Sequence, residues 1–231
     1  MSKQKVIKHS PIIIEVCRLL TGGNFSISAV IPAYFEEKTI ASVVSGCIPY
    51  VDEVIVVNDG SKDNTSIEAL KAGARVIELE RNMGVAIAVQ RGLKEASGDI
   101  LVTLDADGQH SPEEIRSLVE PIILGECDLV MGVRPSLPYF SERVLSWLTS
   151  LRVTCPDAST GFRAIRKEFS DRMNIHGTCL CGVFVLEAVR LGARVKCVPI
   201  SVFEREGSRR IQTRHIRQFF TVLWYLARSF S

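Results

Sequence analysis

The stretch Val102-Thr-Leu-Asp-Ala-Asp-Gly-Gln-His110 joins an apolar run to two carboxylates one residue apart. Residues 100 to 104 predict a buried strand, because they are short, apolar and rich in branched side chains, with Gly98 before them and Gly108 after them. The acidic residues therefore follow the C-terminal end of a strand. Ligands of open α/β sheets bind at that edge, so the stretch predicts both a fold class and a site.

Asp105 and Asp107 predict a cation site at this edge. Alternation along an extended chain places both side chains on one side, and the Gln109 amide oxygen supplies a third donor two residues later. This donor set suits Mg²⁺ or Mn²⁺ holding a diphosphate. A solvated, Asp-rich turn is the alternative, because Asp-x-Asp is a short and common pattern.

The composition favours one globular domain. The chain has 231 residues, of which 46% are hydrophobic and 23% are charged. A net charge of +2 gives no reason to expect a nucleic-acid partner, and no apolar run reaches the roughly 18 residues of a spanning helix. Seven scattered cysteines favour reduced thiols. We found no secretory signal and expect a cytoplasmic protein.

A strand, a polar turn and a helix follow one another repeatedly, which predicts a mostly parallel, doubly wound α/β sheet with flanking helices in one domain. The expected strands are 28–31, 52–57, 75–79, 100–104, 128–133, 164–165 and 194–199. The expected helices are 39–47, 66–72, 85–95, one that starts at the N-cap Ser111, 145–153, 167–173 and 184–191. We expect residues 1–26 to be an N-terminal extension with a short helix near residues 12–20, 27–204 the domain, and 205–231 a basic and aromatic helix.

The C-terminal segment places five arginines, between residues 205 and 217, before the aromatic run that starts at Phe219. A basic segment joined to an aromatic, apolar helix is typical of helices that lie on an anionic membrane surface. A terminal helix that packs on the core, with solvated arginines beside it, is the alternative.

Polar residues follow three of the expected strands and should converge on one edge of a parallel sheet. They are Pro32, Tyr34 and Glu36, then Asn58 and Asp59, then Asp105, Asp107 and Gln109. This pattern resembles glycosyltransferase family 2, which has the GT-A (Rossmann-like) fold, and within it the polyprenyl-phosphate sugar transferases of the dolichyl-phosphate mannose synthase type. The matching stretches are 30–36, 56–61, 82–98, 105–110, 132–134 and 159–163.

The resemblance implies roles for individual residues. A nucleotide-diphosphate sugar would be held by Pro32, Tyr34, Glu36, Val57, Asp59 and Ala106, with Asp105 and Asp107. The cation, Mg²⁺ or Mn²⁺, would be held by Asp105, Asp107 and Gln109. Arg134, Arg205 and Arg209 would meet donor or acceptor phosphate, since forked guanidinium groups suit phosphate. The catalytic set would be Asp105, Asp107 and Arg134. For Asp59 a turn-capping role is the alternative, and for the arginines a solvated surface role.

The resemblance further implies a metal-dependent, inverting transferase that moves a hexose, with mannose from GDP-mannose favoured, to a polyprenyl (dolichyl) phosphate. Such an enzyme would lie peripherally on the cytosolic face of a membrane, alone or with a membrane subunit. An anionic lipid phosphate needs no general base. A hydroxyl acceptor would need one, for which Asp157 is the candidate, although pairing of Asp157 with Arg163 is the alternative.

Three rival functions follow from the same residues. The first is the same fold acting on a hydroxyl acceptor, and the second is a non-catalytic subunit that binds a nucleotide sugar. The complete Asp105, Asp107 and Gln109 set argues against the second, because simple binding needs no cation at the leaving group. The third, a nucleotidyltransferase, would show a Gly-rich basic loop after the first strand, and Pro32-Ala-Tyr34 is not one.

Overall fold

The computed structural model describes residues 25–137, 139–177, 179–203 and 215–229. Its centre is a seven-stranded sheet in the order β3-β2-β1-β4-β6-β5-β7. The strands are β1 Ile27–Ala33, β2 Glu53–Asn58, β3 Arg75–Glu78, β4 Ile100–Thr103, β5 Leu129–Val133, β6 Arg163–Arg166 and β7 Val195–Pro199. The helix expected near residues 12–20 lies outside the described residues, so that prediction stays open.

The predicted, mostly parallel α/β sheet is confirmed. Strands β1 to β4 are parallel to one another, and β7 is parallel to β5. Only β6, among the described strands, is antiparallel, to both β4 and β5. It pairs Arg163 with Thr103, two residues before Asp105. The carboxyl ends of β1, β2 and β4 therefore meet at one edge, beside the start of β6.

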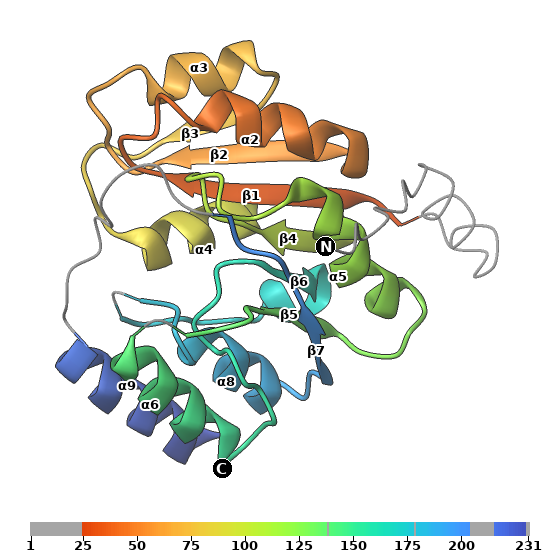
Figure 1. Cartoon of the computed structure of the whole chain (residues 1–231), viewed down its shortest axis with the longest axis vertical. Coiled ribbons are helices and arrows are strands. Elements are labelled where there is room, and N and C mark those ends of the chain that lie inside the picture. Colours follow the sequence, from red (N-terminus) through yellow and green to blue (C-terminus); the bar gives the residue numbers. More distant parts are fainter. Residues whose placement is uncertain (1–24, 138, 178, 204–214, 230–231) are drawn as a thin grey trace, which may run out of the picture.

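The helices form two layers, one on each face of the sheet (Figure 1). The core under the first layer takes residues from α2, α3 and α5, and the core under the second takes residues from α4, α6, α8 and α9. The bounds are α2 Ile40–Cys47, η1 Ile48–Tyr50, α3 Thr65–Lys71, α4 Val85–Glu95, η2 Pro112–Glu114, α5 Ile115–Ile123, α6 Phe140–Ser150, α7 Lys167–Ser170, α8 Val183–Arg190 and α9 His215–Arg228.

Alternate side chains along each strand point to opposite faces of the sheet and so contribute to both cores. In β1, Ala29 and Ile31 face the first layer and Val30 faces the second. Gly92 of α4 lies directly over Val30 and Val57, and any larger side chain there would collide with them. The absence of a side chain at Gly92 thus lets α4 pack close to the strands that carry the polar edge.

Two helix starts differ from the sequence prediction. Helix α6 begins at Phe140 rather than Leu145, because its first turn has Phe140 on the exposed side and lacks the apolar spacing that marks a buried helix. Ser111 makes no capping hydrogen bond, and the 3₁₀ turn η2 precedes α5. The other expected elements agree in type with the structure and end within a few residues of the predicted bounds.

Helix α9 packs against α6 and α8 at the bottom of the molecule (Figure 1). Its Val222, Tyr225 and Leu226 are buried in the second core, whereas Phe220 and Trp224 are exposed. The helix is therefore a core element on one side and an exposed aromatic surface on the other. Within the described residues, every helix is too short or too polar to cross a bilayer.

Candidate active site

The two carboxylates of the decisive stretch lie in a turn after β4. Residues 106 and 107 form the turn and Gly108 has a φ of 75°. The prediction that Asp105 and Asp107 share one side of an extended chain was therefore wrong in its geometry, because the chain turns instead of continuing the strand. Asp107 Oδ1 accepts a hydrogen bond from the Gln109 N–H at 3.2 Å, which stabilises this turn.

Asp105 rests on the turn that leads into β6. A Cβ atom built on Gly161 would lie 2.5 Å from Asp105 Oδ1, so only glycine leaves room for this carboxylate. Thr103 Oγ1 donates to the Gly161 carbonyl at 2.7 Å, which fixes the turn beneath Asp105. The Asp105 side chain is 44% exposed and thus remains open to a ligand.

The charges around Asp105 keep it ionised. Desolvation acts to raise its pKa, but contact with His110 and the charges of Arg163 and Arg134 outweigh it, and the net pKa lies below the ordinary value. His110 Nε2 lies 3.6 Å from Asp105 Oδ2, and its ring is buried against Phe162, with ring centroids 5.1 Å apart. An ionised carboxylate is the form that a hard cation binds.

Asp105, Asp107 and Gln109 fit a divalent cation that draws its remaining ligands from a substrate. The Gln109 Nε2 amide group donates to the Phe203 carbonyl at 3.3 Å, so its amide oxygen is the atom left to coordinate. The described residues contain no group of three or more His, Cys, Asp or Glu side chains that could hold a metal alone. Mg²⁺ sites commonly combine one or two carboxylates with substrate phosphates and water.

Asp59 organises the edge at the end of β2. It is 4% exposed, and its Oδ1 and Oδ2 atoms accept the backbone N–H groups of Met83 at 2.7 Å and Gly84 at 2.9 Å. The turn-holding role that the sequence offered as an alternative is therefore present. A contact of Asp59 with a base or ribose stays a prediction.

The other residues expected to bind the nucleotide differ in how their side chains lie. Tyr34 is 36% exposed at the end of β1. The Glu36 N–H donates to Thr65 Oγ1 at 2.9 Å, which ties this loop to α3. Val57 and Ala106 are buried in the core, so only their backbones are available to a ligand, and Pro32 is half-buried within β1.

Arg134 follows β5 and is held by carboxylates. Its Nε donates to Asp157 Oδ2 at 2.6 Å, and its Nη2 donates to Asp157 Oδ1 at 3.0 Å, to Ser159 Oγ at 2.9 Å and to Glu142 at 3.4 Å. The predicted alternative that Asp157 pairs with Arg163 was wrong, because the loop brings Asp157 to the end of β5. Arg205 and Arg209 lie outside the described residues.

Arg163 is a site residue that the sequence reasoning did not select. The sequence placed it in the Ser159 to Arg163 turn and offered it as a partner of Asp157, yet its pairing with Thr103 places it directly beside the Asp105 strand. Its guanidinium is stacked on Phe184, with the central carbon 4.4 Å from the ring centroid. Its positive charge and its position at the end of this turn were the sequence features that could have marked Arg163 as a site residue.

The edge thus combines the turns at Asp59 and Gly161, the carboxylates of Asp105 and Asp107, and two arginines, where β1, β2 and β4 end. The family model described as "Glycosyl transferase family 2" matches residues 28–186, which run from β1 to the middle of α8. The chain belongs to glycosyl transferase family 2. It is therefore a glycosyltransferase, and its sheet is the GT-A sheet that the resemblance predicted.

This family 2 glycosyltransferase is similar along most of its length to several characterised proteins. A UDP-N-acetylglucosamine–dolichyl-phosphate N-acetylglucosaminyltransferase of Methanococcus voltae is 38% identical over 216 residues, covering 78% of this chain and 86% of the relative. A dolichol-phosphate mannosyltransferase of Pyrococcus furiosus is 31% identical over 172 residues, covering 65% and 49%. The crystal structure of glucosyl-3-phosphoglycerate synthase from Mycobacterium tuberculosis with Mn²⁺, UDP-glucose and phosphoglyceric acid has a TM-score of 0.78 at 26% identity, covering 96% and 85%.

Proposed function

We propose that this glycosyltransferase moves a sugar from a nucleotide-diphosphate sugar to a polyprenyl phosphate, with inversion and with Mg²⁺ or Mn²⁺. The observation that carries the proposal is the placement of Asp105, Asp107 and Gln109 at the edge where β1, β2 and β4 end together. Relatives named for dolichyl phosphate acceptors support the acceptor class. The structural neighbour crystallised with Mn²⁺ and UDP-glucose supports the cation.

The residues at this edge would have different roles in binding the cation, the nucleotide and the acceptor. Asp105, Asp107 and Gln109 would hold the cation, which when bound neutralises negative charge on the departing diphosphate. The Asp59-centred turn and the ends of β1 and β2 form the side where the nucleotide would lie. The acceptor phosphate is anionic at neutral pH and attacks without losing a proton, so this chain needs no general base.

A soluble acceptor that carries a phosphate is the second candidate. It is favoured by the structural match to glucosyl-3-phosphoglycerate synthase, whose crystals hold phosphoglyceric acid. A hydroxyl acceptor requires a group to take its proton, and Asp157 was the sequence candidate. Asp157 is 1% exposed and both of its oxygens accept from Arg134, which makes it a poor base.

The lipid acceptor implies contact with a membrane, and we place it on the aromatic face of α6 and α9. Phe140, Trp147 and Leu151, spaced by seven and four residues, form an exposed stripe along and just beyond α6, and Phe220 and Trp224 are exposed on α9. Arg143 is exposed on α6, and the Arg228 guanidinium lies 4.4 Å from the Trp224 ring centroid. Aromatic and cationic groups together suit an anionic bilayer surface.

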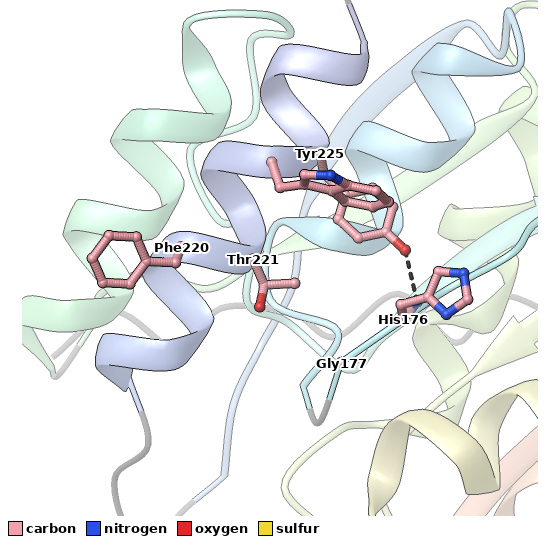
Figure 2. Close-up of a pocket in the computed structure, with 6 residues that line it drawn as sticks. His176, Gly177, Phe220, Thr221 and Tyr225 are labelled. Atoms are coloured by element: carbon pink, nitrogen blue, oxygen red, sulfur yellow. Dashed lines mark hydrogen bonds between the residues drawn. The ribbon is translucent and has the colours of Figure 1, made fainter.

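A groove of about 560 Å³ continues this face beside α9 (Figure 2). It is lined by His176, Gly177, Phe220, Thr221, Trp224 and Tyr225. The Tyr225 hydroxyl accepts the backbone N–H of His176 at 2.7 Å on the inner side of the groove. The Phe220 ring, at the other end of the lining, points away from Tyr225 and His176. The groove gives an apolar chain a place to lie. The cytosolic side is proposed because all six described cysteines are free, as in reducing compartments.

The test is transfer from a panel of labelled nucleotide sugars, including GDP-mannose, UDP-glucose and UDP-N-acetylglucosamine, to a short polyprenyl phosphate and, in parallel, to phosphoglycerate. Wild type and Asp107→Ala are compared with Mg²⁺, with Mn²⁺ and with a chelator. We expect one donor to label the lipid, and Asp107→Ala and the chelator each to abolish transfer while the fold persists. Transfer that survives both treatments would reject the cation, and label found only in phosphoglycerate would select the second candidate.

A further inference from the structure

Arg163 is a buried cation whose hydrogen-bonding groups are not all used. The residue is 3% exposed at the start of β6, on the face of the sheet that α8 covers. Its Nε and Nη1 atoms are buried and have no hydrogen-bond partner among the described residues. Its contact is the face of Phe184, which interacts with the charge but accepts no N–H in the plane of the guanidinium.

Burial of the unpaired Arg163 guanidinium donors destabilises the folded protein when no ligand is bound. Burying a charge or an unpaired donor is unfavourable unless hydrogen bonds or an opposite charge compensate it. The burial of Arg134 is compensated in this way, because Asp157, Ser159 and Glu142 accept hydrogen bonds from its guanidinium group. Arg163 forms no ion pair within 4.0 Å with a described carboxylate, although the Asp105 charge acts on it.

The neighbours of Arg163 place it between the cation ligands and the loop before α8. It pairs with Thr103 across the sheet, and Thr103 holds the Gly161 turn on which Asp105 rests. The loop before α8 carries Cys179 and Cys181, which are both partly exposed and lie close enough to Arg163 to influence its pKa. Gln218 Nε2 of α9 donates to the carbonyls of Cys179 and Cys181, at 3.1 and 2.8 Å, and fixes that loop.

We propose that Arg163 binds the phosphate monoester of the acceptor, through the guanidinium donors that have no partner in the protein. This inference rests on the proposed function. The Nε–H and Nη1–H groups can each donate to a phosphate oxygen, and the position of Arg163 beside the Asp105 strand would place that phosphate near the cation ligands. One phosphate oxygen then forms a bond to the anomeric carbon as the bond from that carbon to the diphosphate oxygen breaks, and the electron pair leaves with the nucleoside diphosphate.

The test compares Arg163→Met and Arg163→Lys with wild type. The probes are geranyl phosphate as acceptor and the nucleotide sugar that wild type uses. We expect Arg163→Met to raise the KM for geranyl phosphate at least about tenfold and to change the donor KM by less than about twofold, with partial recovery in Arg163→Lys. An unchanged acceptor KM, or equal losses for donor and acceptor, would overturn the inference.

Arg116→Met is the matched control. Arg116 is also a buried arginine stacked on an aromatic ring, 4.8 Å from the centroid of Tyr50, but it lies on α5 in the opposite helix layer. We expect its acceptor KM to equal that of wild type. Thermal melts of all variants identify unfolding, and if Arg163→Met does not fold, Arg163→Lys and Arg163→Gln carry the same comparison.

A binding measurement separates failure of this inference from failure of the proposed function. Line broadening of the ³¹P signals of geranyl phosphate, phosphoglycerate and inorganic phosphate is recorded with Mg²⁺ and nucleoside diphosphate. If wild type transfers no sugar to geranyl phosphate, the proposed function fails, yet binding of any phosphate that Arg163→Met removes still supports the Arg163 site. Tighter binding of geranyl phosphate identifies a lipid source, and tighter binding of phosphoglycerate a soluble one. No phosphate binding, or binding that ignores Arg163, rejects the site.

Discussion

Arg134 Nε and Asp157 Oδ2 are 2.6 Å apart, in a bidentate ion pair that joins the end of β5 to the turn before β6. The Asp157 side chain is 1% exposed and that of Arg134 15%. The pair therefore lies in a region where water screens it little. Its first role is to shape the loop that carries Ser159 and Gly161 under Asp105, whatever Arg134 contacts in a substrate complex.

Breaking this pair should destabilise the protein. Asp157→Ala leaves Glu142, at 3.4 Å, as the carboxylate paired with Arg134, and we expect a loss of about 3 kcal/mol in the free energy of unfolding. Urea unfolding followed by circular dichroism measures the loss. The double variant Arg134→Met, Asp157→Leu should be less destabilised than the sum of the two single changes. Equal stability of Asp157→Ala and wild type would show that the pair is not structural.

Gly161→Ala should damage the site and spare the fold. The new methyl group would meet the Asp105 carboxylate, 2.5 Å from Oδ1, and displace it from the cation. We expect transfer to fall about 100-fold or more, because a misplacement of about 1 Å in an active site has this effect. Gly125→Ala is the control, since a Cβ there has no neighbour within 4 Å, although its φ of 72° costs some stability. Normal transfer by Gly161→Ala would refute the packing argument.

Asp128 should make stability depend on acid pH. Its hydrogen bonds from Arg194, at 2.9 and 3.0 Å, lower its pKa below the ordinary value of 3.8 and outweigh partial burial. The folded state therefore favours the ionised form, so the stabilisation is complete above pH 3.8 and is lost as the pH falls through the lowered pKa.

Asp128→Asn tests this linkage. The stability difference between wild type and Asp128→Asn, from urea midpoints, should be largest at pH 7 and shrink below pH 3.8. Asp171→Asn, at an exposed i, i+4 pair with Lys167, should show little difference at any pH. A difference for Asp128→Asn that stays constant into acid would contradict the assignment.

The cysteines should differ in reactivity by position. Burial raises the pKa of Cys47 to about 12 and that of Cys127 to about 11, so few thiolates form at pH 8. A hydrogen bond from Cys155 lowers the pKa of the partly exposed Cys197. Iodoacetamide labelling resolved by peptide mass spectrometry should therefore modify Cys197 well before Cys47 or Cys127. Labelling of all three at one rate in the folded protein would be inconsistent with these environments.

The aromatic face of α6 and α9 should bind anionic membranes. Co-sedimentation with vesicles that contain roughly 30 to 40% of an anionic phospholipid should retain wild type and release much of the variant Phe140→Ser, Trp147→Ser. Each of these exposed aromatic rings should add to the affinity when it inserts into the interface. Transfer to geranyl phosphate in detergent should be unchanged in that variant. The matched change Ile67→Ser, at an exposed apolar residue of α3, should leave binding intact. Equal binding by all three proteins would place the membrane contact elsewhere.

The sequence alone determined the α/β class and most elements, because alternation and strand-to-turn transitions are local signals. Val102 to His110 shows this, since an apolar run must be buried and its terminal acids must emerge at a ligand-binding edge. The convergence of the ends of β1, β2 and β4 also followed, because these strands are parallel neighbours.

The tertiary structure alone decided which charges meet. Asp157 pairs with Arg134 rather than Arg163, although Arg163 is closer in sequence, because an antiparallel β6 sends Arg163 under α8 and leaves Asp157 at the end of β5. The turn at Ala106 and the packing of the Asp105 carboxylate against Gly161 also depend on the tertiary structure. Contacts between loops depend on how separate elements pack, and residue spacing along a chain does not carry that information.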